Sequence, residues 1–103
     1  MSDQATKLIL CWDVLPDQSE AFFEFNQRRF VPGLRQLGIE PTEAWFTQYG
    51  DYPKFLVAGV TANAEHMFYA LESGAWEELL KELLTYVRNF SQRIVPARSG
   101  FQM

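Results

Sequence analysis

The stretch from Thr42 to Thr61 constrains the fold of this chain more than any other part of the sequence. Two β-rich runs, residues 42–49 and 54–61, flank a central segment with the sequence Gly50-Asp51-Tyr52-Pro53. Glycine, aspartate and proline favour turns, whereas β-branched and aromatic residues favour strands. The sequence therefore predicts a β-hairpin with a four-residue loop.

Both faces of this predicted hairpin are apolar. Pairing outward from the loop gives these neighbours: Tyr49 with Lys54, Thr47 with Leu56, and Trp45 with Ala58. One face then carries Trp45, Thr47, Tyr49, Leu56, Ala58 and Val60, and the other carries Ala44, Phe46, Gln48, Phe55, Val57 and Gly59. An antiparallel strand with one face in water alternates apolar and polar residues. Because this hairpin does not, we expect both of its faces to be covered.

The remaining sequence predicts two strands and two helical regions. Strands are expected at residues 6–14 and 90–97, the first again apolar on both faces. A helix is expected to begin at Asp17, with Glu20 completing a capping box, to kink at Pro32 and to end at Gly38. A short helix capped by Asn63 runs to residue 71, and a longer one is expected at 75–89.

The order strand, helix, strand, strand, helix, strand predicts a ferredoxin-like α+β sandwich. In this fold both helices cover one face of a four-stranded antiparallel sheet. A chain of 103 residues, expected to form one domain over 1–103, has nothing left for the other face. Exposed apolar sheet favours association, so we expect a homodimer through the open face. Two such sheets facing each other enclose a barrel-like interior.

Composition narrows the function without identifying it. The net charge of −4 argues against nucleic-acid binding, and no apolar run is long enough for a membrane span or resembles a signal peptide. We therefore expect a cytoplasmic protein. Cys11 is the single cysteine and His66 the single histidine, which predicts no metal site and no intrachain disulfide. No cofactor motif is present, so we expect no cofactor.

The element order resembles the dimeric α/β-barrel superfamily, which includes antibiotic-biosynthesis-monooxygenase-like and NIPSNAP-like proteins. The resemblance covers nearly the whole chain as element order. Locally it rests on Leu71-Glu72-Ser73-Gly74-Ala75-Trp76, a small-residue break before the last helix, and on the Leu-rich stripe that follows. It implies the fold and the dimer. It assigns no role to Trp12, Asn26 or His66.

Six residues are predicted to bind a ligand. Trp45, Thr47 and Tyr49 share the face expected to line the barrel, and aromatic residues with one polar tip suit both a ligand wall and a dimer interface. Asn26 and Arg29 fall within the aromatic arc of the first helix, either at its edge or pointing into a pocket. Arg93 on the last strand either binds an acidic ligand or forms a surface ion pair.

Two functions remain open on the sequence alone. One is a homodimer that binds a small apolar or aromatic molecule between its sheets, without chemistry. The other is a cofactor-independent monooxygenase- or isomerase-like enzyme, whose candidate proton-transfer groups are Asp13, Tyr49 and His66. A barrel packed solid by its own side chains would leave only a structural dimer.

Overall fold

A computed structural model describes residues 4–48 and 53–97 of the chain. The strands and helices follow in the order β1 (Thr6–Val14), α1 (Ser19–Phe25), α2 (Val31–Gln36), β2 (Glu40–Thr47), β3 (Lys54–Thr61), α3 (Ala64–Leu71), α4 (Gly74–Leu83) and β4 (Val87–Pro96). A 3₁₀ turn at Pro16–Gln18 precedes α1, and a π-helical turn at Asn26–Phe30 joins α1 to α2. This is the predicted α+β, ferredoxin-like order.

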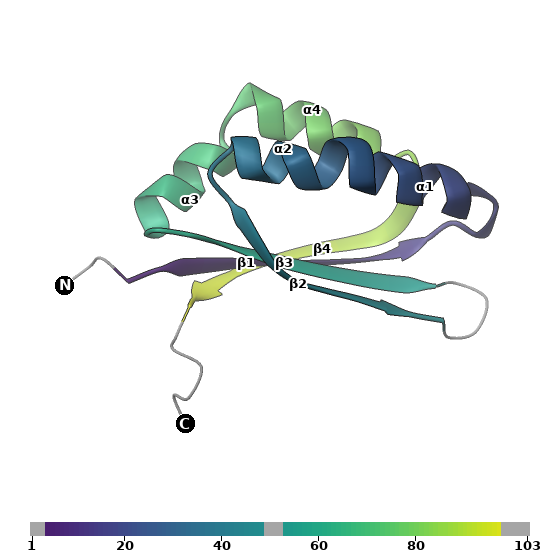
Figure 1. Cartoon of the computed structure of the whole chain (residues 1–103), viewed down its shortest axis with the longest axis horizontal. Helices are drawn as coiled ribbons and strands as arrows, with labels where there is room; N and C mark the ends of the chain where they lie inside the picture. Colours follow the sequence, from purple (N-terminus) through teal and green to yellow (C-terminus); the bar gives the residue numbers. More distant parts are fainter. Residues whose placement is uncertain (1–3, 49–52, 98–103) are drawn as a thin grey trace.

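The four strands form one antiparallel sheet in the order β2-β3-β1-β4. All of the helices lie on the same side of this sheet (Figure 1). Side chains of a strand alternate between its two faces, so each strand contributes one set of residues to the helix-covered face and one to the open face. In β1 the even-numbered residues are buried beneath the helices, and the odd-numbered ones lie on the open face.

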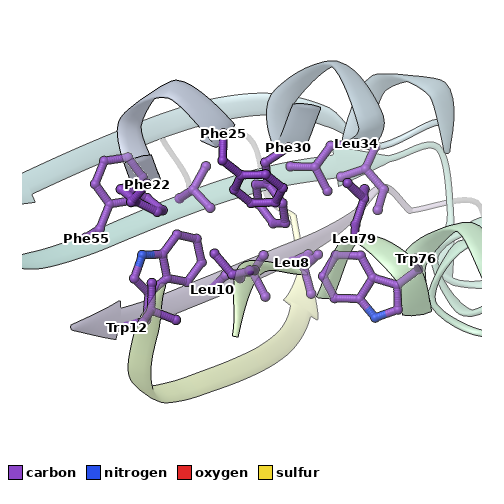
Figure 2. Close-up of a cluster of buried hydrophobic side chains, with 14 of the residues drawn as sticks. Leu8, Leu10, Trp12, Phe22, Phe25, Phe30, Leu34, Phe55, Trp76 and Leu79 are labelled. Atoms are coloured by element: carbon purple, nitrogen blue, oxygen red, sulfur yellow. The ribbon is translucent and has the colours of Figure 1, made fainter. Parts of the chain in front are cut away.

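Trp12 of β1 stands at the centre of the covered face. Its indole stacks between Phe55 of β3 and Phe90 of β4, with ring centroids 5.5 and 6.1 Å away. Phe22 and Phe30, from the helical layer, meet it edge to face at 5.8 Å each. Figure 2 shows these rings continuing into a layer of leucines toward Trp76. The covered face is thus a closely packed aromatic core that the chain completes by itself.

The first helical region departs from the expected regular helix at Pro32. Pro32 has no amide proton, and its ring crowds the carbonyl four residues earlier, that of Arg28. One residue before the proline, the Val31 amide donates to the carbonyl of Asn26, five residues back, which widens the turn. The predicted kink is therefore accommodated as a π-helical turn. The predicted capping box at Asp17 is wrong, because Asp17 lies inside the 3₁₀ turn and no side chain caps α1.

The hairpin is confirmed, but its predicted register is wrong by two residues. Thr47 pairs with Lys54 and Trp45 with Leu56, so the connection is longer than four residues. The carbonyl of Pro53 accepts a hydrogen bond of 2.8 Å from the amide of Val14, which ties this end of the loop to β1. A shift of two residues keeps the paired side chains from Ala44 to Thr47 and from Lys54 to Val57 on their predicted faces. Tyr49 lies outside the described residues.

The last helix is shorter, and the last strand longer, than predicted. α4 ends at Leu83 instead of residue 89, and β4 begins at Val87 instead of residue 90. Val87 is buried opposite Val14 of β1, so pairing in the sheet overrides the helical spacing of the leucines. Asn89 has a φ of 56°, a left-handed conformation that asparagine tolerates better than most residues.

Candidate functional site

The open face of the sheet is the candidate site, because no described helix lies on it (Figure 1). Its centre is apolar: Ile9 and Cys11 of β1 lie beside Ala58 and Leu56 of β3 in the paired register. Most of this centre is half-buried by neighbouring strands. An apolar sheet surface of this kind favours either association or ligand binding.

Trp45 and Thr47 project from β2 onto this face, as predicted. β2 is an edge strand whose described residues are almost all exposed, and Trp45 itself is 65% exposed beside Leu56. The next side chain, Phe46, points to the helix side, where its ring centroid lies 5.1 Å from that of Phe23. Phe46 is nevertheless 46% exposed. The helical layer therefore leaves the outer strand of the sheet poorly covered on both faces.

A cluster of polar side chains lies at one end of the open face. The Asp13 carboxylate accepts hydrogen bonds from Lys54 Nζ at 2.8 Å and from Asn89 Nδ2 at 2.7 Å. These two hydrogen bonds, chiefly the one from Lys54, hold the pKa of Asp13 below its usual value, and the bond to the Asp13 carboxylate raises the pKa of Lys54. A carboxylate with a lowered pKa binds a proton weakly, which makes Asp13 a weak candidate for a general base.

Arg93, one of the two cations predicted to bind a ligand, lies on the open face at the opposite edge of the sheet from Trp45. It pairs with Ile9 in register, next to the apolar centre. Toward β2, Lys7 forms an ion pair of 3.4 Å with Glu43. The open face therefore combines an apolar centre with charged groups at its margins.

Asn26 and Arg29 lie in the helical layer, away from the open face. Arg29 Nη2 binds Glu82 of α4 at 3.1 Å, and the Tyr86 hydroxyl approaches the same carboxylate at 3.4 Å. Burial and the neighbouring Glu82 raise the pKa of Tyr86. The side-chain oxygen of Asn26 is buried and accepts no hydrogen bond from the described residues. Arg29 therefore joins the π-helical turn to α4, and neither residue can touch a molecule on the open face.

His66 is exposed on α3, again on the helical side of the sheet. Its amide donates to the side chain of Asn63 at 2.9 Å, which confirms the predicted cap. Beside it, a shallow cleft of about 470 Å³ is lined by Leu37, Tyr69 and Ser73 among others. Asp13 and His66 therefore lie on opposite sides of the sheet and cannot act on one bound molecule.

Lys54 and Asn89 were not predicted to belong to the site. Lys54 opens β3, and its position beside Asp13 depends on the pairing of β1 with β3, which the hairpin pattern does not specify. Asn89 fell inside the predicted last helix. Its tolerance of left-handed backbone conformations was the one available signal of the irregularity in the pairing of β4 with β1 at this point.

The described residues show no grouping of three or more His, Cys, Asp or Glu side chains that could hold a metal ion. No helix in the described part of the chain combines the length and the apolar character needed to cross a membrane.

No protein-family model and no curated protein sequence matches the chain. Among solved structures, a putative antibiotic biosynthesis monooxygenase from Nitrosomonas europaea is similar, at 15% identity over 94% of this chain and 93% of that one, with a TM-score of 0.66. A NIPSNAP domain protein from Burkholderia xenovorans is 9% identical over 91% and 95%, with a TM-score of 0.70. The cofactor-independent oxygenase SnoaB from Streptomyces nogalater is 12% identical over 97% and 99%, with a TM-score of 0.67. These likenesses confirm the resemblance at the level of the fold.

Proposed function

We propose that the protein is a homodimer whose two open sheet faces enclose a binding site for a small apolar or aromatic molecule. The observation that carries this proposal is the apolar centre of the open face, with Trp45 65% exposed at its margin. Burying apolar surface contributes about 25 cal/mol per Å². No described helix covers this face, and a second copy of the chain offers a matching apolar face.

The edge strand β2 supports the same proposal. Its residues are exposed on both faces, and its outer edge is not paired within the sheet. A free strand edge that carries the exposed side chains of Trp45 and Phe46 favours association with another chain. The resemblance to dimeric α/β-barrel proteins implies a cover of this kind, and Trp45 would then stand at the wall of the enclosed space.

An oxygenase- or isomerase-like activity has less support. Two structural neighbours are described as a monooxygenase and an oxygenase, which favours this alternative. It requires a proton-transfer group near the substrate. On the open face the pKa of Asp13 is lowered by its hydrogen bonds from Lys54 and Asn89, which makes it a weak base. His66 lies on the other side of the sheet, and Tyr49 lies outside the described residues. We therefore place binding before catalysis.

Sedimentation velocity over a range of protein concentrations tests the dimer. Leu56→Asp, at the centre of the open face, is expected to weaken the dimer at least about 100-fold, because an unpaired charge at an interface is costly to bury. Leu84→Asp is the matched control: Leu84 is exposed on the helical side, so this change leaves the dimer intact. Circular dichroism verifies that both variants fold.

A wild-type chain that sediments as a single 12.0 kDa particle at high micromolar concentration would end the proposal. An equal effect of the two aspartates would also contradict it, because the association would then not use the open face.

A further inference from the structure

The open face carries an excess of positive charge, and we propose that the molecule enclosed there is an organic anion with an apolar body. This inference rests on the proposed homodimer and names the class of its ligand. Four cationic side chains project onto the face: Lys7, Lys54, Arg88 and Arg93. Three acidic residues share this face in the paired register: Asp13, Glu43 and Glu40.

Without Glu40, the described part of the face has two more positive than negative charges, although the whole chain has a net charge of −4. Glu40, at the start of β2, does not correct this balance, because its carboxylate lies 3.7 Å from Arg35 of the helical layer. The charge of this face therefore has the opposite sign to the charge of the protein, which would favour an anionic partner.

Arg93 is the cation left for such a partner. Lys54 is bound to Asp13 at 2.8 Å and Lys7 to Glu43 at 3.4 Å. Arg88 acts electrostatically on Asp13. The side chain of Arg93 makes no ion pair or hydrogen bond with any described residue. Its guanidinium, which can bind a carboxylate or phosphate through two parallel hydrogen bonds, remains available.

The position of Arg93 specifies the rest of the ligand. Arg93 pairs with Ile9, and two residues earlier Ser91 pairs with Cys11, so the guanidinium borders the apolar centre. Trp45 lies on β2, three strand spacings from β4, which is roughly 14 Å. An anion bound at Arg93 can therefore rest its apolar body on Ile9, Cys11 and Leu56 and extend toward the indole.

When a second copy covers the open face, a bound anion should stabilise the dimer. Two faces of like charge repel each other when they meet, and an unpaired guanidinium shielded from water is costly. An anion between the faces offsets both costs. Ligand binding and dimer formation should therefore strengthen each other.

Binding of three probes with the same ring system tests the inference by isothermal titration calorimetry and by sedimentation. 1-Naphthoate and 1-naphthyl phosphate are anions, and 1-naphthamide is their neutral counterpart. The wild-type protein should bind at least one anion about tenfold more tightly than the amide, and that anion should strengthen the dimer. The better of the two anions distinguishes a carboxylate ligand from a phosphate ligand.

Arg93→Gln should reduce the preference for the anion to less than about threefold, whereas Arg28→Gln on the exposed helical side should leave it unchanged. Equal binding of amide and anions would overturn the inference, since the face would then be neutralised by acidic groups of the second copy. A preference that survives in Arg93→Gln would overturn it as well. Either result with an intact dimer leaves the proposed homodimer standing, whereas a chain that never dimerises rejects the homodimer itself.

Discussion

The two faces of the sheet are built by the same four strands, yet the chain completes only one of them. On the covered face Trp12 is fully buried and contacts four aromatic rings. On the open face Trp45 is 65% exposed. Both tryptophans lie in strands with apolar neighbours. The difference between them is therefore not residue type but the presence of a helical layer over one face only.

This contrast separates folding from assembly. Substitutions on the covered face should change the free energy of unfolding of the single chain. Substitutions on the open face should leave folding nearly unchanged and alter association or ligand binding. The predictions below test this separation, starting with the largest expected effect.

Trp12→Ala should reduce the free energy of unfolding by about 3–5 kcal/mol, because it removes the ring on which the aromatic core converges. Trp45→Ala should cost less than about 1 kcal/mol under the same conditions. Urea denaturation followed by circular dichroism, at a concentration where the variants are single chains, measures both. Trp12→Phe keeps a ring in place and should fall between the two, which guards against an alanine variant that does not fold.

Comparable losses for the two alanine variants would break the comparison, because Trp45 would then belong to the folding core. The result would also remove the main support for an open face that is completed by a second copy.

The division into two faces could be predicted from the sequence, because it follows from alternation along the strands. Even a hairpin register wrong by two residues placed Trp45 and Leu56 on the same face. The strand at Thr6–Val14 and the helix capped by Asn63 also agree with the structure, since a local pattern determines each of them.

The polar cluster on the open face could not be predicted in the same way. Asp13, Lys54 and Asn89 come together only because β1 lies between β3 and β4, an order that depends on the whole sheet. The orientation of Asn26 and Arg29 could not be predicted for a different reason, which is local. Helical periodicity placed them on the aromatic arc, but the π-helical turn and Glu82 decide where they point.

Gly59→Ala, also on the covered face, should lower the free energy of unfolding by about 1–3 kcal/mol, less than Trp12→Ala. A Cβ atom at this position of β3 would lie 2.7 Å from the Ile39 side chain and 3.1 Å from the Glu40 carbonyl oxygen. The carbonyl belongs to the backbone and cannot move without disturbing β2. Thermal and urea denaturation measure the loss.

Gly74→Ala is the matched control, since nothing outside its chain neighbours and its own helix backbone lies within 4 Å of the added Cβ. It begins α4, where alanine loses less conformational entropy on folding than glycine. This variant should therefore be neutral or slightly stabilised. Equal destabilisation of both variants would mean that the backbone at Gly59 adjusts, and that the packing of the covered face does not exclude a methyl group.

The smallest expected effect concerns Asp13 and acid. Its pKa is lowered in the folded chain, chiefly by the hydrogen bond from Lys54. The carboxylate therefore stabilises the fold above its unfolded pKa of about 3.9, and this contribution disappears as the pH falls through the lower, folded pKa. Because the Lys54 side chain is half exposed, the pair contributes less than about 1 kcal/mol.

Asp13→Asn should accordingly be less stable than wild type at pH 7 and no less stable at the acid end of the range. Urea denaturation at a series of pH values, with both proteins in the same oligomeric state, measures this convergence. Lys54→Met removes the larger cause of the pKa shift and should flatten the acid dependence similarly. A constant difference in stability between Asp13→Asn and wild type at every pH would contradict this prediction. It would show that position 13 stabilises the fold through packing, and that the charge of Asp13 makes no contribution to stability.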